Sequence, residues 1–237
     1  MTCPAAVLLD IDDTLVDTRH AFTVAIGGIV ERWLPHLDRA GAERALAHWV
    51  ADADGHFRAY TRGEIGFTEQ RARRARALHA AFDGPALDED AVARWDTDYD
   101  DAFRRAWRLF PEASGFLDRL DAAGVPYGAV TNAGRDYQRD KLRRVGLAER
   151  LRMMVSVDDL GVGKPDPRVF RRACANLGVA PGDAVYVGDE LDVDARGASE
   201  AGLRGIWLDR HGRSRELVGL DVPAVSSLTE LADLYSW

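Results

Sequence analysis

The stretch FLDRLDAAGVPYGAV, residues 116–130, carries the signals that decide the fold. Residues 116–123 have a helical pattern and are followed by Gly124. Glycine commonly ends a helix, because it adopts the left-handed backbone conformation without a steric penalty. Residues 125–130 form a short apolar run, which predicts a buried strand. A helix, a glycine and a strand thus follow one another in a single short unit.

The same order recurs along the chain. Helical patterns that end at a glycine also occur at residues 137–145, 169–177 and 194–201. Further apolar runs occur at residues 7–9, 153–157, 184–187, 205–208 and 222–225. Alternating helices and short apolar strands are typical of βαβ units, in which helices cover a parallel sheet. The predicted fold class is therefore α/β, with a Rossmann-like parallel-sheet core in a three-layer α/β/α arrangement.

One long segment lacks the strand pattern. Residues 17–108 contain no comparable apolar run, but they show helical stretches at residues 21–34, 44–53, 68–82 and 91–107. We therefore expect an α-helical domain inserted after the first strand. The core is predicted to consist of residues 1–16 and 109–237, and the insert of residues 17–108.

The composition limits the classes of protein to consider. A chain of 237 residues fits a core plus an insert, and its hydrophobic fraction of 46% can fill a sizeable interior. The formal net charge of −8 argues against a nucleic-acid partner, which would favour a basic surface. Two cysteines, Cys3 and Cys174, give no disulfide framework. Neither a secretory leader nor a membrane span is visible, so we expect a cytoplasmic protein without a membrane partner.

Two carboxylates follow the first predicted strand. Asp10 comes directly after residues 7–9, and Asp12 lies two positions further on. Ligands of open parallel sheets bind beyond the carboxyl ends of the strands, so both side chains are predicted to lie at the site. Such a pair can divide the work between a nucleophile and a general acid/base. The alternative is a strand-to-loop turn that uses aspartate for its turn chemistry.

Other strand ends carry polar groups as well. Thr131 and Asn132 follow the second strand and could hold an anion, although both are also common helix caps. Lys164 precedes a predicted helix and could neutralise phosphate, although an exposed loop lysine is the simpler interpretation. Asp189 and Asp194 follow the strand at residues 184–187. They suit a Mg²⁺ site, although carboxylates also stabilise a helix N-terminus without any metal.

Together these residues resemble the haloacid dehalogenase (HAD)-like hydrolase superfamily. Residues 10–15, DIDDTL, are similar to its first motif. Thr131 resembles the second motif, Lys164 the third, and Gly188-Asp189 with Asp194 the fourth. The helical insert resembles the type-1 cap of subfamily I, and the whole pattern resembles the phosphatase branch. Asp13 is a departure, because many members have glycine at that position.

The resemblance implies a Mg²⁺-dependent phosphatase. Asp10 would attack phosphorus and carry the aspartyl-phosphate. Asp12 would protonate the leaving oxygen and then activate water, and Lys164 would offset the charge of Asp10 and the phosphate. Residues assigned in this way to the substrate phosphate are Asp13, Thr14, Thr131 and Asn132.

The resemblance also implies a set of metal ligands. The carboxylates of Asp10 and Asp189 and the backbone carbonyl of Asp12 would bind Mg²⁺, while Asp194 would steady that metal shell or Lys164. Phosphoryl transfer depends chiefly on positioning and charge neutralisation, which is what such a set supplies.

The insert offers candidate specificity groups. They are Trp33, His36, His48, Trp49, His56, Arg58, Tyr60, Arg62, Arg71 and Arg74. Arg71 and Arg74 share a helix face by their spacing, whereas His48 and Trp49 cannot share one. Most of these side chains are expected to pack within the insert or to face solvent.

Three alternatives stay open. A dehalogenase on the same fold would need no acid for its halide leaving group, and dehalogenases of this family lack the second aspartate, so Asp12 argues against it. A phosphomutase is compatible with all four motifs. A non-catalytic binding protein is disfavoured by the intact set Asp10, Asp12, Lys164 and Asp189. The expected substrate is a small soluble phosphomonoester, and the expected assembly is a monomer or a homodimer.

Overall fold

A computed structural model describes residues 3–213, 219 and 221–237. The chain divides into two compact units, one formed by Met1–Asp17 with Leu109–Trp237 and the other by Thr18–Arg108. We refer to them as the core unit and the cap unit.

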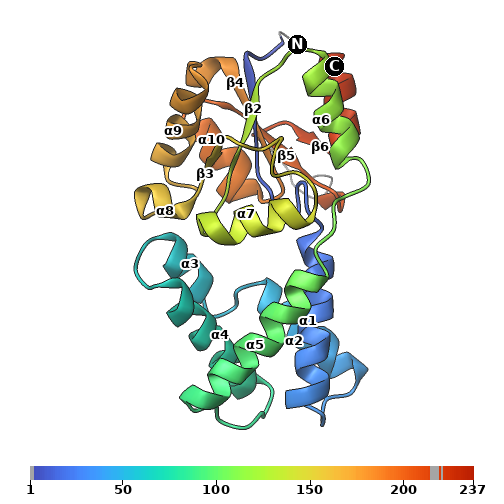
Figure 1. Cartoon of the computed structure of the whole chain (residues 1–237), viewed down its shortest axis with the longest axis vertical. Helices are drawn as coiled ribbons and strands as arrows, with labels where there is room; N and C mark the ends of the chain where they lie inside the picture. The colour runs from blue at the N-terminus through green and yellow to red at the C-terminus, as the bar shows by residue number, and fades with distance from the viewer. Residues whose placement is uncertain (1–2, 214–218, 220) are drawn as a thin grey trace. The chain divides into compact units, whose positions relative to one another are not determined.

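The core unit is built on a six-stranded sheet in the order β3-β2-β1-β4-β5-β6 (Figure 1). All neighbouring strands are parallel. The strands are β1 (Ala6–Leu9), β2 (Tyr127–Val130), β3 (Met154–Val155), β4 (Ala184–Gly188), β5 (Arg204–Leu208) and β6 (Ala224–Val225). The predicted α/β fold with a parallel sheet is confirmed.

Both faces of the sheet are buried. Successive side chains of a strand point to opposite faces, and in β1 this sends Val7 and Leu9 into one apolar cluster and Leu8 into another. The first cluster is filled by α6 (Ala113–Ala122) and α11 (Leu228–Tyr235), the second by α9 (Pro167–Leu177). Continuous apolar strands of this kind require helices on both sides, which gives the predicted three layers.

Short helices complete the core unit. They are α7 (Arg135–Arg144), α8 (Val157–Leu160), α10 (Gly197–Glu200), the 3₁₀ turn η1 (Pro181–Asp183) and the π-helical η2 (Leu191–Arg196). The strand predicted at residues 153–157 is shorter, because Ser156 and Asp159 form a capping box that starts α8. The helix predicted at 194–201 begins earlier, with the π-helical turn of η2.

All the regular secondary structure of the cap unit is helical. Its helices are α1 (Thr18–Trp33), α2 (Arg39–Val50), α3 (His56–Thr61), α4 (Phe67–Ala81) and α5 (Glu89–Arg105). Asp38 and Asp88 cap α2 and α5 through their side chains. The short helix α3 was not predicted from the sequence. The interior is aromatic, with Trp49, Trp95 and Tyr99 all almost fully buried.

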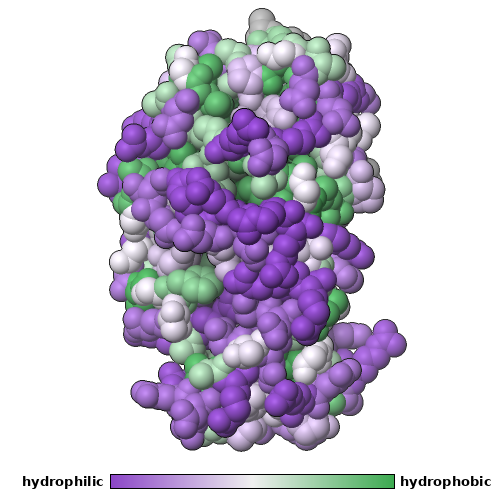
Figure 2. Space-filling model, viewed as in Figure 1, coloured by the Kyte–Doolittle hydropathy of each residue, from purple (hydrophilic) through white to green (hydrophobic). Residues whose placement is uncertain are grey.

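The visible surface is mostly hydrophilic, with scattered apolar spots (Figure 2). The large apolar side chains recorded as exposed, Val24, Phe67 and Leu234, lie on three different helices. In the described part of the chain, no helix combines the length and apolar character needed to span a bilayer. Cys3 and Cys174 are both free thiols.

Candidate active site

The candidate site lies where three neighbouring strands end. Asp10 follows β1, Thr131 follows β2, and Asp189 follows β4. Because β2, β1 and β4 are adjacent and parallel, these ends share one edge of the sheet. A parallel sheet therefore brings together residues that are far apart in the sequence.

Lys164 joins this edge and binds two carboxylates. Its Nζ donates to Asp10 Oδ1 at 2.6 Å, to Asp194 Oδ1 at 2.7 Å and to Tyr186 Oη at 2.9 Å. The side chains of Lys164, Asp10 and Asp194 are nearly inaccessible to solvent. A buried ammonium needs such partners, since an unpaired buried charge is very costly. Lys164 is thus a buried counter-charge to Asp10 and not an exposed loop lysine.

The pKa values follow from this burial. Burial raises the pKa of Asp10 to about 8, although Lys164 partly offsets the effect. Burial alone would lower the pKa of Lys164, but Asp10 and Asp194 outweigh it and raise that pKa well above its usual range. Burial, together with the charges of Asp194 and Asp10, raises the pKa of Asp189 well above its usual range. The site therefore holds more negative charge than Lys164 balances.

This excess of carboxylates fits a divalent cation. One oxygen from each of Asp10, Asp189 and Asp194 lies within 4.8 Å of the others. Asp194 is already engaged, because Oδ1 binds Lys164 and Tyr186 while Oδ2 accepts from the amide of Glu190 at 3.0 Å. Asp10 and Asp189 are therefore the better ligands, and oxygen donors suit a hard cation. Asp194 acts on Lys164 and on its own loop.

The backbone of the first loop is tightly held. Asp13 adopts a left-handed conformation with φ of 55°, which aspartate tolerates better than most residues. Arg210 donates to the carbonyl oxygens of Asp13 at 3.3 Å and Thr14 at 2.8 Å. Thr14 is fully buried, and its hydroxyl has no hydrogen-bond partner within the described residues. The predicted role of Thr14 at the substrate phosphate stays a prediction.

The side chain of Asn132 binds the backbone of Lys164, and its contact with the phosphate stays a prediction. Its amide nitrogen donates to the carbonyl oxygen of Lys164 at 3.0 Å, and its Oδ1 accepts from the amide of Lys164 at 2.6 Å. A Cβ on Gly163 would lie only 2.3 Å from that Oδ1, so glycine is needed for this close approach. The side chain of Asn132 therefore clamps the loop that carries Lys164.

Thr131 is set up to donate. Its Oγ1 accepts from Gln138 Nε2 at 2.9 Å and from the amide of Ala133 at 3.1 Å. A hydroxyl oxygen has two lone pairs and one proton. Because both lone pairs accept hydrogen bonds, the hydroxyl proton of Thr131 is available for donation. An anion is bound by such a donor.

Several site residues escaped the sequence analysis. Gln138 and Lys141 contact Asp12 from α7, and Tyr186 contacts Lys164 from β4. Trp207 Nε1 donates to the carbonyl oxygen of Asp189 at 2.9 Å. Tyr186 and Trp207 lie in buried strands, where an aromatic residue is indistinguishable from core. Gln138 and Lys141 lie in the charged stretch RDYQRDKLRR of α7, which looks solvent-exposed.

The cap candidates mostly serve the cap unit itself. The Arg74 guanidinium lies 3.8 Å from the ring centroid of Trp49 and donates to its carbonyl oxygen. Arg71 lies 4.3 Å from the ring centroid of Tyr99 and pairs with Asp96. His48 and Trp33 are also engaged within the unit, with Asp54 and Asp98 respectively.

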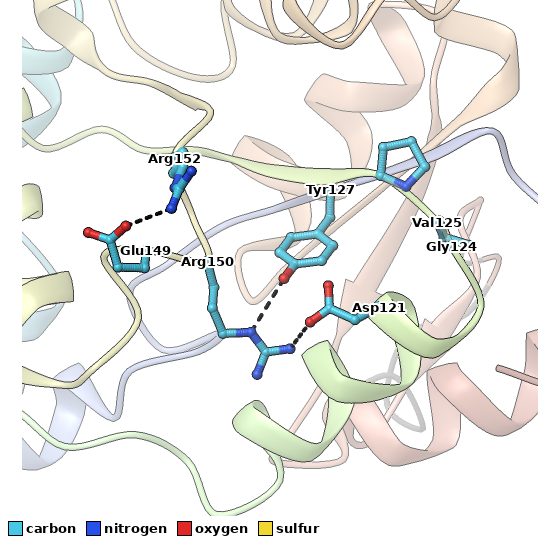
Figure 3. A pocket seen from close by; sticks show the side chains of 8 residues that line it. Asp121, Gly124, Val125, Tyr127, Glu149, Arg150 and Arg152 are labelled. Atoms are coloured by element: carbon cyan, nitrogen blue, oxygen red, sulfur yellow. Dashed lines mark hydrogen bonds and ion pairs between the residues drawn. The ribbon is translucent and has the colours of Figure 1, made fainter.

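A pocket of about 560 Å³ is lined by residues that include Tyr127, Arg150 and Arg152 (Figure 3). It borders the start of β2, at the opposite end of that strand from Thr131. Its arginines are paired locally: Arg150 binds Asp121 and Tyr127, and Arg152 binds Glu149. The pocket therefore offers no unbalanced charge that would recognise an anion.

Comparison with known proteins agrees with this geometry. The sequence model of the haloacid dehalogenase-like hydrolases matches residues 4–202. The chain therefore belongs to the haloacid dehalogenase-like hydrolase family, which confirms the resemblance and the prediction of a hydrolase.

Individual relatives cover most of the chain. A phosphoserine phosphatase of Thermus thermophilus is 36% identical over 227 residues, covering 86% of this chain and 88% of that protein. Among solved structures, a magnesium-bound HAD hydrolase from Bacillus subtilis has a TM-score of 0.82 at 21% identity, with full coverage of both chains. An L-2-haloacid dehalogenase has a TM-score of 0.78 at 22% identity, again with full coverage of both. At these identities the two structures support the fold alone.

Proposed function

We propose that this protein is a Mg²⁺-dependent phosphatase that hydrolyses a small phosphomonoester through an aspartyl-phosphate on Asp10. The observation that carries the proposal is the pairing of Asp10 with Lys164 beside the carboxylate of Asp189. A nucleophilic carboxylate can approach an anionic phosphate only where positive charge is concentrated. Lys164 supplies part of that positive charge. In this proposal Mg²⁺ supplies the remainder, because the carboxylates at the site outnumber Lys164.

The first step forms the covalent intermediate. A carboxylate oxygen of Asp10 attacks phosphorus while the bond to the ester oxygen breaks, and Asp12 gives that oxygen a proton. Thr131 donates its hydroxyl hydrogen bond to a phosphoryl oxygen, and Lys164 offsets the charge of Asp10. Bound at Asp10, Asp189 and the Asp12 carbonyl, Mg²⁺ would neutralise phosphoryl charge.

The second step restores the enzyme. Asp12, now ionised, takes a proton from water as that water attacks phosphorus, and the bond from phosphorus to Asp10 breaks. Inorganic phosphate leaves, and Asp12 again holds a proton. Asp12 thus acts from one position in both steps, as the acid in the first and as the base in the second.

The same residues bear on the two alternative activities, those of a dehalogenase and of a phosphomutase. A dehalogenase would have no use for a second carboxylate beside Asp10. A phosphomutase would share both steps except that a second hydroxyl replaces water. The phosphatase relative at 36% identity supports hydrolysis of a phosphomonoester over either of these. Phosphoserine, sugar phosphates, other phosphorylated short acids and nucleoside monophosphates are the first substrates to examine.

The test is a panel of phosphomonoesters with Mg²⁺, scored for free phosphate. The panel should include phosphoserine, and a parallel assay should score chloride release from 2-chloropropionate. Asp10→Asn is the matched control, because it keeps the shape of the side chain and removes the nucleophile. Phosphate release that Asp10→Asn abolishes supports the proposal. Chloride release, or transfer of phosphate to a second hydroxyl, would replace it with one of the alternatives.

A further inference from the structure

The helix α7 presents two buried polar side chains on one face. Gln138 and Lys141 are three residues apart, so they lie next to each other on the helix surface. Both are almost fully buried, with exposures of 0% and 1%. By contrast, Arg139 and Arg143 on the same helix are exposed. Burial of a glutamine and a lysine in such a charged helix requires a specific reason.

Both side chains meet Asp12. Gln138 Nε2 donates to Asp12 Oδ2 at 2.7 Å, and the ammonium of Lys141 forms an ion pair with Asp12 Oδ1. The two carboxylate oxygens are therefore held separately, which fixes the rotation of the carboxylate plane. Charge-assisted hydrogen bonds of this kind are among the stronger ones.

Gln138 also reaches the anion-binding loop. The same Nε2 donates to Thr131 Oγ1 at 2.9 Å, so one amide group connects Asp12 with Thr131. The other end of this amide, Oε1, has no partner within the described residues. A buried unsatisfied carbonyl costs roughly 1–3 kcal/mol. Packing alone would not favour that cost, whereas a need to aim Nε2 at both acceptors explains it.

We propose that Gln138 and Lys141 are positioning residues for the second aspartate. They hold Asp12 at the orientation required for proton transfer, and Gln138 keeps the Thr131 hydroxyl as a donor to the phosphoryl group. This proposal rests on the proposed phosphatase function. It assigns neither residue a direct contact with the substrate.

The experiment compares kcat and KM of Gln138→Met and Lys141→Met with those of the unmodified protein, using the best ester of the panel with Mg²⁺. Methionine approximates the length of both side chains and removes their donors. Arg143→Met on the exposed face of α7 is the control and should change kcat less than about twofold. Each buried variant should lower kcat about 10- to 100-fold, a part of the 10²–10⁴-fold that general acid–base catalysis supplies. KM should change less than about threefold.

A double-mutant cycle separates positioning from a general structural role. In the Asp12→Asn background, Gln138→Met and Lys141→Met should cost less than about threefold, because nothing remains to be positioned. Losses that persist in full in that background, or losses carried mainly by KM, would overturn the proposal while leaving the phosphatase function intact. If Lys141→Met does not fold, Gln138→Met carries the test, since it removes no charge. An unmodified protein without phosphatase activity would instead refute the proposed function itself.

Discussion

Lys164 Nζ lies 2.6 Å from Asp10 Oδ1, although 154 positions separate the two residues in the sequence. The pair is buried, and Asp194 shares the same ammonium group. One cation thus faces Asp10 and Asp194, while the carboxylate of Asp189 stands beside them and has no ion pair among the described residues. Among the described residues, the carboxylates at this site therefore outnumber the one lysine that pairs with Asp10.

Metal binding should depend on pH. Burial raises the pKa of Asp10 from 3.8 to about 8, so the metal-free folded protein holds a proton that the unfolded chain has released between these values. Its stability should therefore fall as pH rises from about 4 to about 8. Mg²⁺ competes with that proton, so its stabilising effect should grow over the same range. The measurement is the shift of Tm on adding Mg²⁺ to protein treated with chelator, at several pH values.

Two variants sharpen this measurement. Asp189→Ala should remove most of the Mg²⁺-induced shift at every pH, because a hard cation with few protein ligands cannot spare one. Asp192→Ala changes an exposed carboxylate of η2, close to Asp189 in the sequence, and should leave the shift intact. A shift that is independent of pH, or that survives in Asp189→Ala, would contradict the metal site.

Much of this site could be predicted from the sequence, because strand ends are recognisable. Asp10, Thr131 and Asp189 each follow a short apolar run, and a parallel sheet must bring such ends together. Asn132 shows the limit of that argument. Its position predicts a phosphate contact, which stays a prediction, whereas the bonds of its side chain to the backbone of Lys164 could not be predicted because they depend on where a distant loop passes.

Gln138 and Lys141 show a second limit. The helical pattern predicted α7, yet which of its polar residues are buried depends on Asp12, 126 positions before Gln138. The final helix α11 was not predicted for a different reason. It follows a very short strand, and the burial of its apolar residues Leu228, Leu231 and Tyr235 depends on their packing in the apolar cluster of the sheet. The local sequence pattern thus predicted the helices and strands better than it predicted which distant residues they contact.

The role of Asp12 predicts a dependence on the leaving group. Asp12→Asn should slow the first step about 10²–10⁴-fold for esters of poor leaving groups, which need a proton on the departing oxygen. An activated aryl phosphate should lose much less. The measurement is the pre-steady-state burst of alcohol or phenol across a series of esters. Equal losses for good and poor leaving groups would contradict the acid role.

Arg74 should matter for stability within the cap unit. Its guanidinium lies over Trp49 and donates to a backbone carbonyl, and its side chain is largely buried. Arg74→Met should therefore lower the free energy of unfolding by about 1–3 kcal/mol, from the lost cation–π contact and the lost charged hydrogen bond to the Trp49 carbonyl. Arg73→Met is the matched control, because it loses only an exposed ion pair with Glu69, worth roughly 0.5 kcal/mol. Urea unfolding of both variants gives the comparison, and similar midpoints would show that Arg74 is not a structural residue.

Gly188 should be irreplaceable for steric reasons. A Cβ at this position would lie 2.3 Å from Asp194 Cγ and 2.4 Å from its Oδ2, a separation that no real side chain tolerates. Gly188→Ala must therefore displace Asp194, which binds Lys164 through Oδ1 and the Glu190 amide through Oδ2. Overpacking of this kind costs about 1–3 kcal/mol.

The loss of activity should exceed what that destabilisation explains. Once Asp194 moves, Lys164 loses one of its two carboxylate partners and its fixed place beside Asp10, so kcat should fall at least about tenfold at a temperature where the variant is fully folded. Gly182→Ala is the control, since a Cβ there meets nothing within 4 Å, and it should leave both Tm and kcat nearly unchanged. If Gly188→Ala kept the kcat of the unmodified protein, the position of Asp194 would have no part in holding Lys164 for catalysis.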